Sequence, residues 1–350
     1  MSTPSPTSSK SPDLKTRLAL IANSLKRLMQ VTPRESKMTA GVDIGSSAVK
    51  VVALGAKKGA GPRLVLGQNL VSLQPGQDVD ASNAIKTAVS ALNLPLPAVN
   101  LSVSGQWVIM RVIEMPNMAP GEMKQALPFE AQRYLPFNLQ EVLIDGALLG
   151  PAEAGKMWVL IVACRKELIE RRIDWARRAG LEVGLIDVDA LALTNSFLAT
   201  RNGESAEATY VLVNIGAQTT NLTVCKNSIP YLVRDIPWGA EKFCRHTAEQ
   251  LGMDPATLDL SKETAIPGLA EAMKAVAESL VTELQLSFDY FENRFGHPPG
   301  EIFVSGGLSQ SSAFLNALKP HVTQPVTLWT PAQGLSGQFV VAFGLALRTD

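Results

Sequence analysis

Apolar and polar positions alternate most regularly from residue 38 onward, and the first apolar run contains a single carboxylate. The segment GVDIGSSAVK at 41–50 places Asp43 inside this run and follows it with the turn Gly45-Ser46-Ser47. The pattern predicts two strands joined by the turn, with a further strand near 64–71. A carboxylate inside a predicted strand calls for a chemical explanation, because an unpaired buried charge is costly.

The elements that follow alternate between helices and strands. They are predicted, in order, as a helix over 83–92, paired strands over 100–115, a helix from about 121 that contains Pro128, strands over 141–149 and 157–164, an amphipathic helix over 166–179 that Gly180 ends, and a long helix after the strand-like Leu185-Ile186-Asp187. The opening β-β-β-α-β order is typical of an α/β fold.

The second half of the chain repeats the design of the first. In TYVLVNIGAQTTNLTVCKNSIPYLVRDI an apolar strand, a glycine turn with small hydroxyl residues and another strand follow one another, and Asn214-Ile215-Gly216 repeats the shape of Asp43-Ile44-Gly45. The later predicted elements are helices over 240–251 and 270–294, a strand ending in a Gly-Gly turn, a helix over 310–318 and the apolar helix VVAFGLALR, whose Gly344 permits the close approach of a neighbour. Two related hairpins predict two lobes.

The first 37 residues differ from the rest. A Ser/Pro/Thr tract comes first, and residues 13–31 then form a basic amphipathic helix pattern with Leu14, Leu18, Ile21, Leu25 and Leu28 on one face. This composition suits an anionic membrane surface or the groove of a partner, and docking on its own domain is the alternative. Both interpretations stay open.

The composition limits the partners and cofactors of the chain. Of its 350 residues 46% are apolar, and Lys and Arg number 32, as do Asp and Glu, so no net positive charge favours nucleic acid. Cys164, Cys225 and Cys244 lie far apart and the three histidines are scattered, which fits a reducing cytoplasm and offers no zinc site. No apolar stretch approaches the roughly 20 residues that a membrane-spanning helix needs.

The two hairpin turns have the chemistry of phosphate-binding loops. A Gly-Ser-Ser turn exposes successive backbone N–H groups with hydroxyls beside them, which form a concave site for phosphate oxygens. Two such turns facing each other across a cleft would hold a polyphosphate between them. Lys50 can add a positive charge, and Asp43 is placed to hold Mg²⁺ through water, because this ion prefers carboxylate oxygen and keeps several waters.

Four of these elements together resemble a known superfamily. AGVDIGSSAVK, VLVNIGAQTTNL, FVSGGLSQ and VVAFGLALR are similar, in the same order, to the phosphate-1, phosphate-2, adenosine and final connecting elements of the actin, heat-shock-chaperone and sugar-kinase superfamily. The segment from RVIEMP to VLIDG resembles the inserted subdomain that the division protein FtsA shares with the PilM family of type IV pilus assembly proteins. FEAQRYLPF, LIDVDALALTNSF and RDIPWGAEKF are most similar to the PilM family.

This resemblance implies a two-lobed actin-like α/β fold with an FtsA/PilM-type inserted subdomain. The ranges it implies are 1–37 for the tract and basic helix, 38–115 for the first part of the first lobe, 116–187 for the inserted subdomain, 188–333 for the second lobe and 334–350 for a final helix that returns to the first lobe.

The resemblance also implies a function and a set of site residues. It predicts a cytoplasmic protein that binds ATP and Mg²⁺, attaches to the bacterial inner membrane through the cytoplasmic tail of a PilN-like protein, and connects other pilus components to the motor. The implied nucleotide-binding residues are Asp43, Gly45, Ser46, Ser47 and Lys50 in the first phosphate loop, Gly216, Ala217, Thr219 and Thr220 in the second, Glu241 and Lys242 near the ribose and base, and Gly306 and Gly307 near the adenine.

One position departs from the pattern of hydrolytic relatives. Where those have a second aspartate before Ile-Gly, this chain has Asn214, which is neutral and cannot act as a base. Gln218 could orient a water molecule or lie on the surface. Because a general base contributes on the order of 10²–10⁴-fold, we expect slow hydrolysis or none. A small-molecule kinase and an FtsA-like filament-forming division protein remain as alternatives.

A partner groove is expected beside the inserted subdomain, where Phe129, Tyr134, Leu135 and Phe137 cluster around two prolines. We expect Phe129 in the subdomain's own core, whereas Tyr134 and Phe137 stay open between core and groove. Arg171, Arg172, Arg177 and Arg178 are expected to form a solvated helix face.

Overall fold

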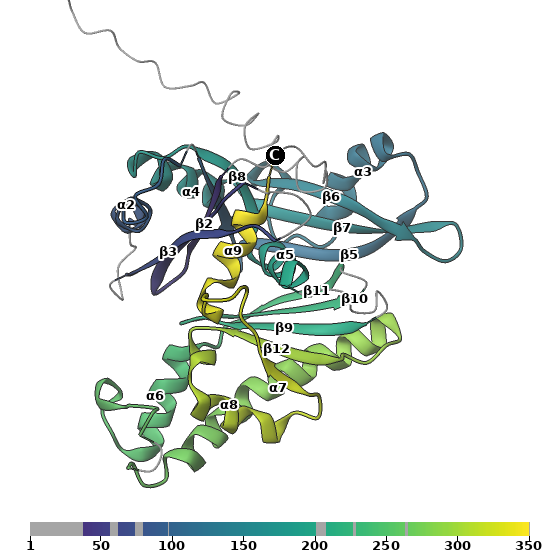
Figure 1. Cartoon of the computed structure of the whole chain (residues 1–350). Coiled ribbons are helices and arrows are strands. Elements are labelled where there is room, and N and C mark those ends of the chain that lie inside the picture. Colours follow the sequence, from purple (N-terminus) through teal and green to yellow (C-terminus); the bar gives the residue numbers. More distant parts are fainter. Residues whose placement is uncertain are drawn as a thin grey trace, which may run out of the picture.

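The computed structural model describes residues 38–56, 62–73, 80–96, 98–200, 208–226, 229–262 and 265–349. They form two lobes, each built on a five-stranded sheet, and a third, smaller sheet beside the first lobe (Figure 1). The basic helix predicted over 13–31 lies outside the described residues.

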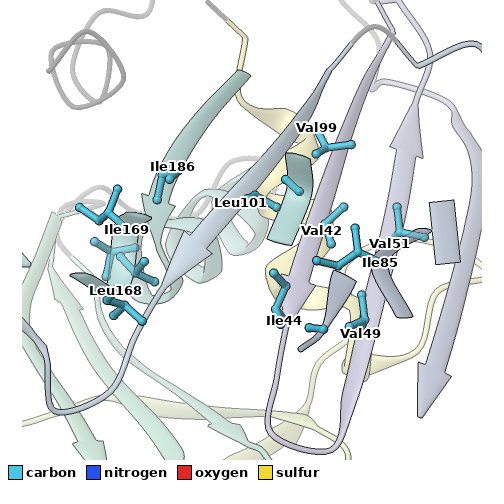
Figure 2. Packing of buried hydrophobic residues seen from close by; sticks show 14 of the residues in the cluster. Val42, Ile44, Val49, Val51, Ile85, Val99, Leu101, Leu168, Ile169 and Ile186 are labelled. Atoms are coloured by element: carbon cyan, nitrogen blue, oxygen red, sulfur yellow. The ribbon is translucent and has the colours of Figure 1, made fainter. Parts of the chain in front are cut away.

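The first sheet has the order β3-β2-β1-β4-β8. Its antiparallel part consists of β1 (Thr39–Ile44), β2 (Ala48–Leu54) and β3 (Val65–Ser72), and β4 (Val99–Val103) and β8 (Val183–Val188) extend it in parallel. Helices α2 (Ser82–Ser90) and α4 (Lys166–Arg178) cover one face through Ile85, Leu168 and Ile169, as Figure 2 shows. The β-branched residues of β1 and β2 alternate across this sheet, which explains why the predicted hairpin forms.

The second sheet repeats this order as β11-β10-β9-β12-β13. Its strands are β9 (Thr209–Ile215), β10 (Thr220–Lys226), β11 (Ile229–Ile236), β12 (Glu301–Gly306) and β13 (Val326–Leu328). Its outer face is covered by α6 (Ala240–Leu251), α7 (Leu269–Phe295) and α8 (Ser312–Leu318). The repetition predicted from the two hairpins is therefore confirmed at the level of strand order.

Two helices lie between the sheets and connect the lobes (Figure 1). They are α5 (Asp189–Thr200) and α9 (Val340–Leu347), and they cross at Gly344, where a Cβ would collide with the backbone carbonyl of Ala192. A second close approach occurs at Gly41 of β1, which lies against the carbonyl of Ala342 in α9. The close approach expected at Gly344 is thus confirmed.

The third sheet forms a separate small core. Its order is β5-β7-β6, with β5 (Val108–Pro116), β6 (Val142–Pro151) and β7 (Lys156–Arg165) all antiparallel. Helix α3 (Pro120–Gln132) packs on it through Met123 and Leu127 and keeps Pro128 inside the helix. The inserted subdomain predicted over 116–187 stays a prediction in its bounds, since this sheet runs from residue 108 to 165 and β8 pairs within the first sheet.

Candidate functional site

The first hairpin turn lies at the end of β1 and β2 that faces the other lobe. Asp43 and Lys50 are directly opposite in the antiparallel register, and the Lys50 Nζ donates a hydrogen bond to the Asp43 Oδ2 at 2.8 Å. The Asp43 carboxylate is buried, so this pairing offsets part of the cost of burying its charge. Gly45 uses its N–H within the turn, at 3.0 Å from the Ala48 carbonyl, and Ser46 and Ser47 are exposed at the tip.

The second hairpin turn is tied to the start of α6. The N–H of Gly216 donates to the carbonyl of Thr219, and the N–H groups of Ala240 and Glu241 donate to the carbonyls of Gly216 and Ala217, each at 2.9 Å. The first N–H groups of α6 are therefore occupied by the loop itself. Ala217, Gln218 and Thr219 remain at least partly accessible to solvent.

Two side chains predicted at the second loop are already engaged. The hydroxyl of Thr220 is fully buried and donates to the Trp238 carbonyl at 2.7 Å, so it holds the loop rather than facing a ligand. The Gln218 amide donates to the Glu241 carboxylate at 3.3 Å, which places Glu241 beside the loop. Lys242 follows it and is half-buried.

The Gly-Gly turn lies next to the second loop. Gly306 is paired in parallel register with Ile215 and Ser305 with Asn214. Gly306 has a φ of +95°, and a Cβ there would collide with the carbonyl of Ile215, so only glycine fits at this contact. Gly306, about 90 residues from Asn214 and the second loop in sequence, thus meets them at the carboxyl ends of β9 and β12.

Two carboxylates that the sequence analysis did not assign to the site lie between the lobes. Asp189 begins α5, and burial raises its pKa to about 7, with further increases from the negative charges of Asp43 and Asp235. Hydrogen bonds from the hydroxyls of Ser102 and Ser104 lower the pKa of Asp189 and so oppose these increases. The signal available in the sequence was an aspartate directly after a buried strand, at the edge where ligands bind in α/β sheets.

Asp235 joins the two lobes. It lies on β11 and its Oδ2 accepts a hydrogen bond from the N–H of Gly105, which follows β4, at 2.6 Å. Its Oδ1 accepts from the Asn221 amide at 2.8 Å. The three carboxylates of Asp43, Asp189 and Asp235 therefore come from both lobes, and the negative charges of Asp43 and Asp235 both act on Asp189.

The predicted arginine face is only partly correct. Arg177 and Arg178 are exposed and pair with Asp174, as expected for a solvated surface. Arg172 instead turns inward, and its Nη2 donates to the carbonyl of Ile44 at 3.3 Å. Burial lowers its pKa, while the nearby charges of Asp189 and Asp43 raise it.

The four side chains expected in a partner groove do not act as one group. Phe129 is 73% exposed, so its expected place in the subdomain core is wrong. Leu135 packs against that core. The Tyr134 ring lies 6.0 Å from the Arg111 guanidinium, and the Phe137 ring lies 5.8 Å from the Trp107 ring.

A groove of about 880 Å³ opens beside these aromatic contacts. It is lined by consecutive residues of β5, including Arg111, by consecutive residues of β11, and by Leu286 and Tyr290 of α7, which are about half exposed. Thr219 of the second hairpin turn also lines the groove. The groove therefore extends from the second hairpin turn to the third sheet.

Two other kinds of site are absent from the described part of the chain. There, no group of three or more His, Cys, Asp or Glu side chains is arranged to hold a metal ion by itself. Nor does any helix in the ranges given above combine the length and apolar character needed to cross a membrane.

Comparisons with known proteins identify the fold. At 25% identity, the chain is similar to a solved structure titled "PilM-PilN type IV pilus biogenesis complex", with a TM-score of 0.76 over 88% of this chain and 97% of that chain. It is also similar to the ethanolamine utilization protein EutJ from Carboxydothermus hydrogenoformans, at 15% identity and a TM-score of 0.55 over 95% and 98% of the two chains. The predicted two-lobed actin-like α/β fold is thus confirmed.

A third similar structure is a diol dehydratase-reactivating factor in nucleotide-free form, with 8% identity, a TM-score of 0.58 and coverage of 89% and 99%. At this identity it supports the fold alone. The family model described as type IV pilus assembly protein PilM matches residues 41–350, which includes both hairpin turns, the third sheet and α9. The chain therefore belongs to the PilM family of type IV pilus assembly proteins.

Proposed function

We propose that this protein is a nucleotide-binding scaffold of the type IV pilus machinery, which binds ATP with Mg²⁺ between its lobes and holds the cytoplasmic tail of a PilN-like membrane protein. The observation that carries the proposal is the family match over 41–350, together with the similarity to a protein solved as a PilM-PilN complex. We place it in the cytoplasm, at the inner membrane through this partner, where other pilus and motor components would meet it.

The phosphates would lie between the two hairpin turns. Because Gly45 uses its N–H within the turn, the donors of the first loop would be the N–H and hydroxyl groups of Ser46 and Ser47. In the second loop Gly216 and Thr220 are engaged in the loop structure and the Gln218 side chain bonds Glu241, which leaves the backbone N–H groups of Ala217, Gln218 and Thr219 to face the ligand.

The adenosine would lie between α6 and the Gly-Gly turn. Glu241 and Lys242 begin α6 beside the second loop, at the place where a ribose would follow the phosphates. Gly306 and Gly307 would allow the backbone to approach the base. No atom lies within 4 Å of the place that a Cβ of residue 307 would occupy, so there is space beside Gly307.

The carboxylates between the lobes suit a divalent cation. Burial raises the pKa of Asp189, and the negative charges of Asp43 and Asp235 raise it further, so a cation at this place would favour the charged carboxylate. Mg²⁺ usually takes one or two carboxylates, several waters and substrate phosphates, so the lack of a larger acidic cluster is compatible with it. Asp43 would hold the ion through water, and the bound ion would offset charge on the phosphates.

The tail of the partner would bind at the third sheet. Among the described strands β5 pairs only with β7, so the other edge of β5 presents backbone groups to the groove. An extended peptide can form backbone hydrogen bonds with such an edge and place apolar side chains in adjacent pockets. Tyr134 and Phe137 lie against Arg111 and Trp107, two residues that line the groove.

Calorimetry with nucleotide-free protein tests the nucleotide part of the proposal. We expect Mg·ATP to bind, and ATP at 100 times its dissociation constant to raise the free energy of unfolding by roughly 2.7 kcal/mol. Ser46→Ala and Lys50→Ala should weaken binding, whereas the exposed Lys124→Ala on α3 should leave it unchanged. An absence of heat and of thermal stabilisation with wild-type protein would refute nucleotide binding.

A further inference from the structure

Arg172 occupies an unusual place for an arginine, on the buried side of α4. Leu168 and Ala176 lie four residues before and after it, and both belong to the core of the first lobe. Side chains four residues apart share one face of a helix, so Arg172 points in the same direction as these apolar neighbours. Figure 2 shows Leu168 and Ile169 of α4 and Ile44 of β1 as members of the same apolar cluster.

The guanidinium reaches the backbone just before the first phosphate loop. The pairing of β1 with β4 extends only to Val42 and Leu101, so the Ile44 carbonyl lies beyond the last pair of the parallel ladder. Arg172 donates to this carbonyl through Nη2 at 3.3 Å. Gly45, the first residue of the turn, follows directly in the chain.

The guanidinium of Arg172, a half-buried residue, has few hydrogen-bond partners among the described residues. Its Nε is shielded from solvent and has no hydrogen-bond partner among the described residues. Its ring contact is with Trp175, with 5.1 Å between the guanidinium carbon and the ring centre. A charged group that is shielded and incompletely hydrogen-bonded is costly, so its retention calls for compensation by nearby negative charge.

The charges around the first loop provide this compensation. Lys50 is already engaged by Asp43 in the 2.8 Å ion pair, and Asp189 adds a further carboxylate. Arg172 lies close enough to Asp43 and Asp189 for both charges to act on it. A polyphosphate that entered here would meet the carboxylates of Asp43 and Asp189 while Lys50 is already paired, so the positive charge of Arg172 would offset part of their repulsion, because charges within a shielded site interact strongly.

We propose that Arg172 is a positioning residue for the polyphosphate: it fixes the backbone at the entrance of the first phosphate loop and supplies the positive charge that lets an anionic ligand bind beside Asp43 and Asp189. The proposal rests on the nucleotide binding proposed above and extends it to α4. A consequence is that the contribution of Arg172 to affinity increases with the number of phosphates on the ligand.

The test is a calorimetric comparison of ATP, ADP and adenosine, with Mg²⁺ present, for wild type, Arg172→Met and Arg172→Lys. We expect Arg172→Met to lose about tenfold or more in affinity for ATP, less for ADP, and none for adenosine. Arg172→Lys keeps the charge and should recover most of the ATP affinity. Arg177→Met is the matched control, because Arg177 is an exposed arginine on the same helix, and it should behave as wild type.

The outcomes separate this inference from the proposed function. If wild type binds ATP and Arg172→Met either matches it or loses equal affinity for all three ligands, the charge role of Arg172 is refuted while nucleotide binding stands. If Arg172→Met does not fold, Arg172→Gln decides, because it removes the charge and keeps a hydrogen-bond donor: a loss larger for ATP than for adenosine supports the charge role, and wild-type affinity for all three ligands contradicts it. If wild type binds none of the three ligands, the proposed nucleotide site itself is wrong.

Discussion

At the scale of single residues, the site is defined by charges that lie closer together than the sequence suggests. Asp43 was expected to serve a metal and phosphates, and the structure adds its ion pair with Lys50 and its neighbour Asp189. The hairpin pattern could indicate Asp43, because both partners lie within one local motif. Asp189 and Asp235 could not be found in this way, since only the packing of α5 and β11 between the lobes brings them together.

Asp189 gives a prediction about pH. Its pKa in the folded protein, about 7, lies above the ordinary value of 3.8, so the folded state holds this proton more tightly than the unfolded chain. The stability associated with the proton is fully present below pH 3.8 and is lost as the pH rises toward 7. Asp189→Asn has no carboxyl to ionise at this position and therefore does not lose this stability. At pH 8 its free energy of unfolding without nucleotide should exceed that of wild type by roughly 1–4 kcal/mol, and near pH 4 the two should differ little.

Thermal unfolding of wild type and Asp189→Asn across this pH range checks the prediction. The difference in melting temperature between the two proteins should grow as the pH increases. A difference that is constant with pH would show that the Asp189 carboxyl does not titrate as described.

Asn214 gives a prediction about turnover. It is half-buried at the end of β9, beside Ser305, and it cannot accept a proton as a base would. Wild-type ATP hydrolysis should therefore fall well below about 1 per second, the lower part of the ordinary enzyme range. Asn214→Asp should raise the rate, as measured by phosphate release, and Asn293→Asp on the exposed side of α7 is the matched control. A wild-type rate at or above that value contradicts the scaffold interpretation.

At the scale of elements, the strands and the order of the two hairpins follow from local pattern, whereas the crossing of α5 and α9 depends on packing. The apolar sequence of α9 predicted a buried helix, and its glycine predicted a close contact, but the identity of the neighbour required the structure. For Phe129, in contrast, the burial predicted from the sequence was wrong. Its aromatic side chain suggested the core of the inserted subdomain, yet Met123 and Leu127 fill the face of α3 that packs on the sheet and leave Phe129 exposed.

The crossing of the two helices can be tested by adding one methyl group. Gly344→Ala should place a Cβ against the Ala192 carbonyl and force α5 and α9 apart. Overpacking of this kind costs roughly 1–3 kcal/mol, so the midpoint of urea unfolding should fall. Gly121→Ala on α3 is the control, because nothing lies within 4 Å of the added Cβ there. Equal stability of both variants would mean that the helices do not meet at Gly344.

The third sheet gives a prediction about the partner. Phe137 is half-buried against Trp107 and the Arg165 guanidinium, at the end of the sheet nearest the groove. Phe137→Ala should weaken binding of the PilN-like tail by roughly 30-fold, the effect of losing an anchoring aromatic side chain, while Mg·ATP binding stays unchanged. Phe129→Ala provides the comparison, and peptide titration measures both. Loss of tail binding in Phe129→Ala alone would move the partner surface to the exposed side of α3.

At the scale of the whole molecule, the third sheet contacts both lobes. Leu160 of β7 belongs to the core of the first lobe. On the side of the second lobe, the Trp158 ring of β7 lies 5.9 Å from the Phe295 ring at the end of α7, and Asp235 of β11 accepts a hydrogen bond from the N–H of Gly105, at the start of the segment leading to β5. The groove lies between these two contacts and has Thr219 of the second loop in its wall. This arrangement gives a physical route by which a nucleotide between the lobes could alter the site proposed for the partner tail.

We propose that this PilM-family protein holds the tail of a PilN-like membrane protein. The most direct measurement is calorimetric titration of a peptide comprising the cytoplasmic tail of the PilN-like protein from the same organism into wild-type protein in the presence of Mg·ATP. We expect saturable binding of one peptide per chain, weakened by Phe137→Ala and retained by Phe129→Ala. Absence of any peptide-dependent heat with folded, nucleotide-bound protein would contradict it.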